Sequence, residues 1–145
     1  MLRAAERISN PMTEQVIIGL SSYPDETGAG QLGHQLVTEG LAACVTRVPG
    51  ARSTYAWQGS VQDAAEVLLI IKTTAERLPA LKSRLRALHP YEVPELLTLP
   101  VTDGNEPYLQ WVADTVRAGI ASEARTAAPP ATPGAAPAPQ PEIKP

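Results

Sequence analysis

The fold is decided by Val67-Leu68-Leu69-Ile70-Ile71-Lys72-Thr73, a run of five large aliphatic residues that ends in two polar ones. A short continuous apolar run of this kind, rich in β-branched residues, is typical of a strand with both faces buried. Val16-Ile17-Ile18-Gly19-Leu20 has the same character. These two runs predict the central strands of a sheet.

Between the two runs, the pattern predicts a helix and a long strand. Pro24-Asp25-Glu26 opens the helix with Asp25 as N-cap, and Gly40 closes it as a C′ glycine. The predicted apolar stripe of this helix is Ala29, Leu32, Gly33, Leu36 and Val37. A strand follows from Ala42, continues past Pro49-Gly50 to Trp57, and turns at Gln58-Gly59-Ser60 into the strand that contains Val67–Thr73.

After Thr73, the pattern predicts a helix, a strand and a further helix. Thr73 and Glu76 have the spacing of a capping box. Leucines recur at helical spacing behind them until His89-Pro90 stops the helix. Leu96–Val101 is a fourth strand, and the residues from Tyr108 to Val116 form an amphipathic helix. The order βαββαβ, followed by one more helix, predicts an α+β fold of the ferredoxin-like type with an antiparallel sheet.

An antiparallel sheet covered on one face should alternate apolar and polar residues, and these strands do not. We expect that two helices covering one face would leave Ile17, Leu68 and Ile70 in water. Burying each such side chain is worth about 1.5–3 kcal/mol. Either the last helix or another subunit must cover them, and we expect another subunit because one short helix covers little of a four-stranded face.

Length and composition predict one domain with two extensions. Within 145 residues, we expect a flexible N-terminal extension at 1–14, a domain at 15–119 and a disordered Ala/Pro-rich tail at 120–145. The net charge of −3 and the lack of a Lys/Arg run argue against nucleic acid as a partner. A single cysteine and the lack of a long apolar run predict a cytoplasmic protein that does not enter the membrane.

Polar and aromatic side chains gather at the hairpin, at Lys72 and in the heptapeptide His89–Glu95. The candidate ligand-binding residues are Arg52, Tyr55, Trp57, Lys72, Tyr91, Glu92 and Glu95. His89 is a candidate metal ligand, although it also suits the C-terminal end of a helix. Lys72 could pair with Glu92 or Glu95, or meet an anionic ligand. No nucleophile with its base and no phosphate loop is visible, so we expect no enzyme.

Four motifs follow one another along the chain: Leu41-Ala42-Ala43-Cys44-Val45, Pro49-Gly50-x-Arg52-Ser53-x-Tyr55-x-Trp57-x-Gly59, Glu66–Thr73 and His89-Pro90-Tyr91-Glu92-Val93-Pro94-Glu95. Together they resemble the CutA family, the divalent-cation tolerance proteins. The resemblance runs from about Val16 to Val116. It implies a ferredoxin-like, PII-like homotrimer joined through the hairpins, with candidate sites in the clefts between subunits.

The resemblance also bears on metal binding. The copper ligands attributed to some members match Ser21, Gln58 and His89, so only the histidine is kept. Ser and Gln are poor ligands for copper. No cofactor is required, and copper or another divalent cation remains a candidate ligand with a weakened ligand set. We therefore expect a non-catalytic trimer involved in the response to metal ions, which binds a metal or small ligand between subunits. The alternative is a PII-like signalling or partner-binding trimer without metal dependence.

Overall fold

The computed structural model describes residues 15–125, and side chains as far as residue 120. In chain order its elements are β1 (Val16–Tyr23), α1 (Glu26–Thr38), β2 (Cys44–Trp57), β3 (Ser60–Thr74), the 3₁₀ turn η1 (Ala75–Arg77), α2 (Leu78–Leu88), β4 (Leu97–Pro100) and α3 (Glu106–Arg125). The N-terminal extension at 1–14 and the tail from 126 onward lie outside the described residues. The last helix continues to Arg125, six residues past the domain end expected at Gly119.

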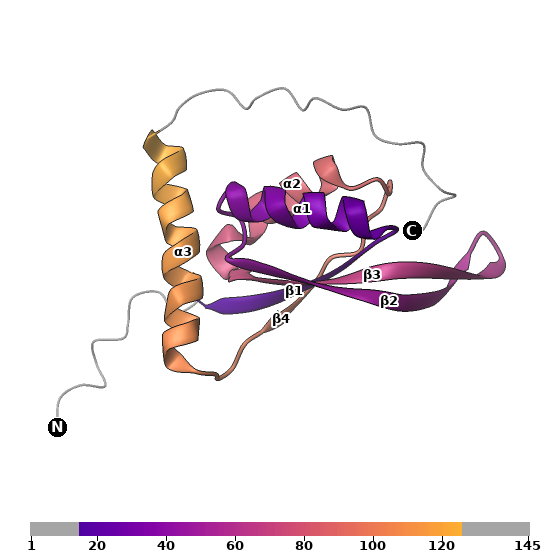
Figure 1. The fold of residues 1–145 in the computed structure, drawn as a ribbon, viewed down its shortest axis with the longest axis horizontal. Coiled ribbons are helices and arrows are strands. Elements are labelled where there is room, and N and C mark those ends of the chain that lie inside the picture. Colours follow the sequence, from indigo (N-terminus) through magenta and orange to yellow (C-terminus); the bar gives the residue numbers. More distant parts are fainter. Residues whose placement is uncertain (1–14, 126–145) are drawn as a thin grey trace.

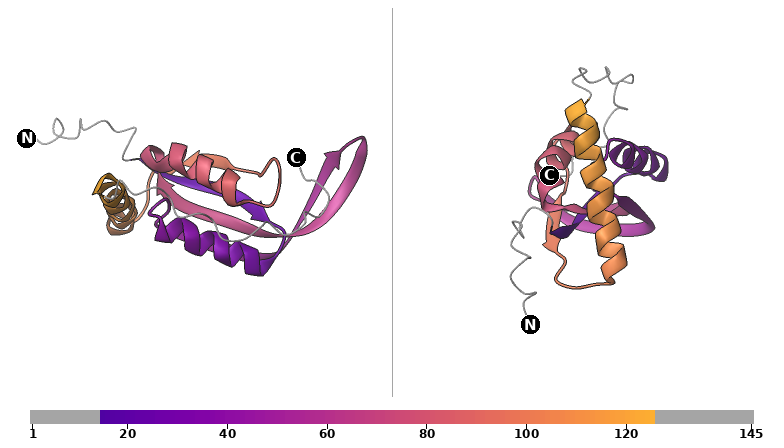
Figure 2. Two further views of the ribbon diagram at one scale, coloured as in Figure 1. Left: turned by 90° about the horizontal axis from the view of Figure 1, so that it is seen from above. Right: turned by 90° about the vertical axis from the view of Figure 1, so that its left-hand side faces the viewer.

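The sheet has the order β2-β3-β1-β4, and each neighbouring pair of strands is antiparallel. This is the ferredoxin-like topology with an added C-terminal helix, and it confirms the predicted fold class. Helices α1 and α2 lie side by side over one face of the sheet, while α3 crosses one end of it (Figures 1 and 2). No helix within 15–125 is long and apolar enough to span a membrane.

Helix α1 begins and ends at the predicted residues. The Asp25 carboxylate accepts a hydrogen bond of 2.6 Å from the backbone N–H of Gly28, which makes it the N-cap. At the other end, Gly40 has φ of 69°, and the N–H groups of Gly40 and Leu41 donate to the carbonyls of Val37 and Leu36. These two bonds define a Schellman motif. The predicted apolar stripe is buried except for Val37, which is 41% exposed.

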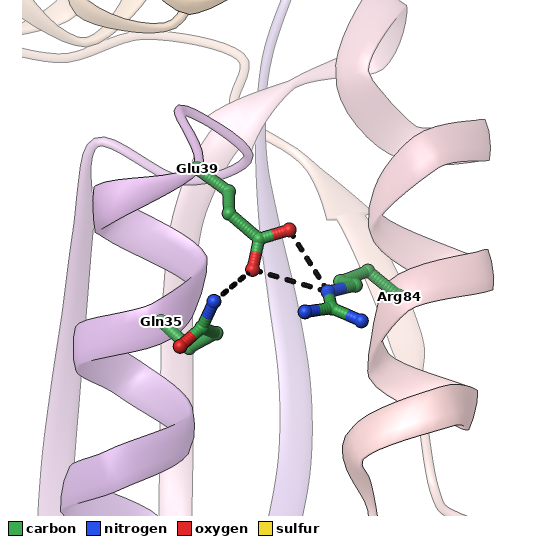
Figure 3. A network of polar contacts seen from close by, with 3 residues as sticks. All are labelled: Gln35, Glu39 and Arg84. Carbon is green, nitrogen blue, oxygen red and sulfur yellow. Dashed lines mark hydrogen bonds and ion pairs between the residues drawn. The ribbon is translucent and has the colours of Figure 1, made fainter. Parts of the chain in front are cut away.

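The core lies between the sheet and the pair α1/α2, and a polar contact joins the two helices near its edge. The Nε atom of Arg84 in α2 lies 2.8 and 3.1 Å from the two carboxylate oxygens of Glu39, and Gln35 donates to the same carboxylate (Figure 3). Both charged side chains are partly buried. The contact fixes the end of α1 against the middle of α2.

Strands β2 and β3 form a long hairpin that projects beyond the helices (Figures 1 and 2). Gln58 and Gly59 both have positive φ, at 47° and 80°, so the two-residue turn is of type I′. The register shifts between Val48 and Ala51, where Pro49 and Gly50 form a bulge. The predicted turn and the predicted continuation past Pro49-Gly50 are therefore confirmed.

The pairing of β1 with β3 corrects the predicted faces. Ile17 lies opposite Thr73, and Gly19 lies opposite Ile71, whose side chain is fully buried in the core beneath α1 and α2. Since directly opposite residues share a face, Ile17 points toward the helices rather than into water. We call the other face of the sheet the open face. Its large aliphatic residues include Ile18, Leu20, Leu68, Ile70, Leu97 and Leu99.

Helix α3 covers only one end of the open face. Val112 and Val116 pack there against Val16 and Ala43. Farther along, Leu97 and Leu99 are 60% and 50% exposed. The expectation that one helix cannot cover this face is confirmed.

The predicted capping box is wrong. Strand β3 continues through Thr74, and the Thr73 hydroxyl is fully buried, where it donates 2.8 Å to the carbonyl of Leu41. Thr74, the residue before η1, makes no side-chain cap. The local pattern predicted that the Thr73 hydroxyl would cap the helix, but in the fold the hydroxyl donates to the distant Leu41 carbonyl instead.

Candidate functional site

Several buried polar side chains of the domain lie close together near the end of β1, where α2 is followed by the loop 89–96. Helix α2 stops because Pro90 disfavours helical conformation at His89, whose backbone is extended with φ of −79° and ψ of 140°. The chain then turns back over the end of β1 before it enters β4. We call the buried group Ser21, Glu66, His89 and Tyr91 the polar cluster.

His89 is held by both ring nitrogens. Nε2 lies 2.7 Å from the carbonyl oxygen of Ser22, and Nδ1 lies 3.0 Å from the backbone nitrogen of Tyr91. A carbonyl can only accept and an amide N–H can only donate, so Nε2 carries the proton and Nδ1 is an acceptor. The imidazole is therefore neutral, and its ring packs between those of Tyr23 and Tyr91 at centroid distances of 5.1 and 4.8 Å.

Tyr91 points from the loop to a buried carboxylate on β3. Its hydroxyl donates 3.0 Å to Glu66, which is only 3% exposed. Burial, followed by the charge and hydrogen bond of Glu66, raises the pKa of Tyr91 well above the ordinary value. The phenol thus stays protonated and serves as a hydrogen-bond donor to Glu66.

A third contact ties the far end of the loop to β1. The buried Ser21 hydroxyl donates 2.7 Å to the backbone carbonyl of Glu95. The loop is therefore fixed at His89, Tyr91 and Glu95. The polar cluster behaves as a rigid anchor for a loop that carries two exposed or half-exposed carboxylates, Glu92 and Glu95.

Only part of the predicted ligand-binding set comes together here. His89, Tyr91 and Glu95 share the loop, and Tyr55 is near enough to affect the pKa of Tyr91 by its charge. Glu92 lies in the same loop but lines an open groove of about 510 Å³ beside α2, together with Lys82 and Arg86. Arg52 is exposed opposite Ala65, and Trp57 lies at the hairpin turn opposite Ser60.

Lys72 lies apart from the polar cluster. Six residues of strand separate it from Glu66, a span of about 20 Å. Its ammonium donates to the hydroxyl of Thr46 and to the carbonyl of Ile70, and it pairs with neither Glu92 nor Glu95. Cys44 lies opposite it on β2, with Sγ 3.9 Å from Thr46 Oγ1, and is half-buried.

Glu66 was missed as a site residue. It stands directly before the apolar run Val67–Ile71, and a glutamate at the start of a buried strand is a carboxylate that must find a partner. The sequence therefore indicated that Glu66 needs a partner. It did not indicate which residue the partner is, because Tyr91 is 25 residues away and reaches Glu66 only through the fold.

The cluster offers a neutral imidazole, a protonated phenol and a buried carboxylate, each used within the chain. Coordination of a metal by His89 would break its bond to Ser22 or to Tyr91. Within residues 15–125, no three His, Cys, Asp or Glu side chains converge as a metal site would require. The two other positions that match the family's copper ligands are not together in this chain. Ser21 belongs to the polar cluster, whereas Gln58 lies in the turn at the tip of the hairpin.

The sequence profile of the CutA1 divalent ion tolerance protein family matches residues 17–115. The chain belongs to this family. It is 48% identical over 103 residues to the divalent-cation tolerance protein CutA of Thermus thermophilus, an alignment that covers 71% of this chain and 97% of the relative. The CutA protein of Escherichia coli is 44% identical over 112 residues, covering 77% and 97% of the two chains.

Solved structures of family members share the fold. The CutA structure from Xylella fastidiosa has a TM-score of 0.69 at 43% identity, covering 70% of this chain and 98% of that one. The rice CutA1 structure, from Oryza sativa, also has a TM-score of 0.69, at 41% identity over 72% and 95% of the chains. A CutA from Archaeoglobus fulgidus, 28% identical with a TM-score of 0.68 over 70% and 98% of the chains, is described as periplasmic. The predicted resemblance to the CutA family is confirmed.

Proposed function

We propose that this protein is a non-catalytic homotrimer that acts in the cytoplasm in tolerance of divalent cations. The family supports the tolerance role, since the relatives from Thermus thermophilus and Escherichia coli carry that name. The polar cluster, whose hydrogen bonds all stay within the chain, supports a binding or structural role rather than catalysis. The proposed number of subunits, three, rests on the resemblance to PII-like trimers.

The open face is the single observation that carries the proposal. Leu68 and Ile70 are only partly buried there, and Leu97 and Leu99 are at least half exposed. Complete burial of an exposed side chain of this size is worth about 1.5–3 kcal/mol, and covering the exposed part of each would contribute a fraction of that to an assembly. A contiguous apolar surface of this kind marks an interface between proteins. Copies of this chain, joined through the hairpin from Ala42 to Thr73, are the proposed cover.

Metal binding in this proposal is weak and lies between subunits. His89 would have to give up an internal bond, and Ser21 already donates to Glu95. Glu92 and Glu95 are the carboxylates that could join His89 from the loop. We therefore propose that tolerance does not depend on a tight copper site within one subunit.

A second candidate function is PII-like signalling or partner binding without metal dependence. One observation favours it: the side chains of the polar cluster form hydrogen bonds that hold the loop 89–96 against β1 and β3. A rigid loop at a subunit boundary suits recognition of a partner or small ligand more than coordination of an ion.

Size-exclusion chromatography with light scattering tests the assembly. The wild-type protein should have the mass of a trimer at micromolar concentration, and Ile70→Lys on the open face should reduce it to smaller species. Val37→Lys is the matched control, because Val37 is an exposed valine on the outer side of α1. A monomeric wild type, or an Ile70→Lys variant that remains a trimer, would refute the proposed interface.

The tolerance role is tested in cells that lack their own family member. Expression of the wild-type protein should restore growth at elevated copper, and Ile70→Lys should not. Calorimetric titration of copper into wild-type and His89→Ala protein then separates the two candidate functions. Restored growth with equal, weak copper binding by both proteins would favour the metal-independent function, and loss of tight binding in His89→Ala would favour direct coordination.

A further inference from the structure

A pocket on the helix-covered side of the sheet is independent of the polar cluster and of the open face. It has a volume of about 280 Å³ and is lined by Glu26, Arg47, Pro49 and Val67. Arg47 and Pro49 come from β2, Val67 from β3 and Glu26 from the first turn of α1. All four belong to one subunit.

The bulge in β2 borders this pocket, and the glycines of α1 leave space for the Arg47 side chain. Arg47 lies opposite Leu69, whose side chain is buried beneath α1 and α2, so Arg47 projects toward the helices. The register then shifts between Val48 and Ala51. A Cβ atom on Gly30 would lie 3.5 Å from Nη1 of Arg47, and one on Gly33 would lie 3.8 Å from it. The guanidinium therefore rests along the glycine surface of α1.

The two charges in the pocket are unpaired. Among residues 15–125, neither the Glu26 carboxylate nor the Arg47 guanidinium has a hydrogen bond or ion pair, with each other or with another residue. By contrast, Arg84 on the neighbouring helix is paired with Glu39. Both charged residues are exposed, whereas Val67, only 4% exposed, gives the pocket an apolar wall.

We propose that this pocket binds a small zwitterion of the amino-acid class. The ligand's carboxylate would pair with the Arg47 guanidinium, which suits planar, bidentate recognition of carboxylates. Its ammonium group would pair with Glu26, and its carbon chain would lie against Val67 and Pro49. The volume is below the range of about 300–1,000 Å³ that is typical of pockets for drug-sized ligands, which favours a small molecule. This site goes beyond the proposed tolerance function and does not require the trimer.

Calorimetric titration of the full-length protein with a matched series of small molecules tests the proposal. Glycine, β-alanine and 4-aminobutyrate carry both charges at increasing separation, whereas propionate and propylamine carry one each. At least one zwitterion should bind with a Kd of about 1 mM or tighter, and the singly charged compounds should bind about tenfold more weakly or not at all. The best separation of charges would report the spacing between Glu26 and Arg47.

Substitutions locate the binding. Glu26→Gln and Arg47→Met should each weaken binding of the preferred zwitterion by about tenfold or more, since each removes one charged pair. Glu76→Gln and Arg86→Met make the same charge changes at exposed positions elsewhere and should leave binding unchanged. Thermal unfolding of all four variants checks that they are folded. The proposal is overturned if no zwitterion binds, or if binding survives in both pocket variants, and neither result bears on the trimer.

Discussion

The backbone of Gly40, at the end of α1, packs directly against the backbone of Gly119 in α3. A Cβ atom built on Gly40 would lie 2.6 Å from the Cα of Gly119, and one built on Gly119 would lie 2.8 Å from the Cα of Gly40. Both neighbours are main-chain atoms, which cannot rotate away. The contact joins the helix layer to the helix that crosses the end of the sheet.

We predict that Gly119→Ala lowers the free energy of unfolding by about 1–3 kcal/mol, because the added methyl group forces the two backbones apart. The sign is diagnostic, since Gly to Ala inside an unhindered helix stabilises by about 0.5–1 kcal/mol. Gly30→Ala is the control: its new methyl would meet only the flexible end of Arg47. Chemical denaturation measures both, and a stabilised Gly119→Ala would contradict the contact.

We predict that Tyr91→Phe lowers the free energy of unfolding at neutral pH by about 1.5–3 kcal/mol, the usual worth of a hydrogen bond to a charged group. The Glu66 carboxylate would lose the hydroxyl that now donates to it.

The same variant should change the dependence of stability on alkaline pH. The pKa of Tyr91 is raised in the fold above its ordinary value of 10.0, so the unfolded chain releases the phenolic proton first. The stability that this residue contributes is complete below pH 10.0 and falls as the pH rises above it. The decline should be shallower in Tyr91→Phe but not absent, because burial also raises the pKa of Tyr23. Equal slopes in denaturation series across this range would rule out the effect.

We predict a measurable coupling between Glu39 and Arg84. A double-mutant cycle with Glu39→Gln and Arg84→Met should give a coupling energy of about 0.5–1 kcal/mol, since both side chains are partly exposed. High salt should reduce this energy by screening the charges. Strictly additive single variants would show that the pair seen in Figure 3 contributes nothing to stability.

We predict that Thr73→Val costs about 1 kcal/mol, because it leaves the buried carbonyl of Leu41 without the Thr73 hydroxyl. Thr74→Val is the matched control, as its side chain makes no cap at η1. Were the capping-box interpretation right, the helix start would weaken in Thr73→Val, and circular dichroism would show lost helix. We expect helix content to be unchanged.

The order and type of the elements could be predicted because they depend on local patterns. Asp25, Gly40 and the Gln58-Gly59 turn each impose a conformation through their own chemistry, and the structure keeps all three. The face of Ile17 could not be predicted, since it depends on the register between β1 and β3. Register is a long-range property that a single strand does not encode.

The candidate site was predicted less well for a related reason. The heptapeptide His89–Glu95 was correctly chosen as an unusual loop. Its chemistry, however, is set by Ser22 and Glu66, which are 67 and 25 residues away from their partners. Lys72 was grouped with the loop by its residue type, and only the sheet shows that it lies on the open face, opposite Ile18.

The outer part of the hairpin has no helix layer over it, and from Ala51 to Ala65 not one residue is buried. A two-stranded ribbon standing alone is marginally stable in water at best. Its backbone amides should therefore exchange quickly with deuterium in dilute solution and slowly once neighbouring copies cover them. The exchange rate of these hairpin amides should therefore depend on protein concentration, because assembly protects them. The amides of β1 should stay protected at every concentration.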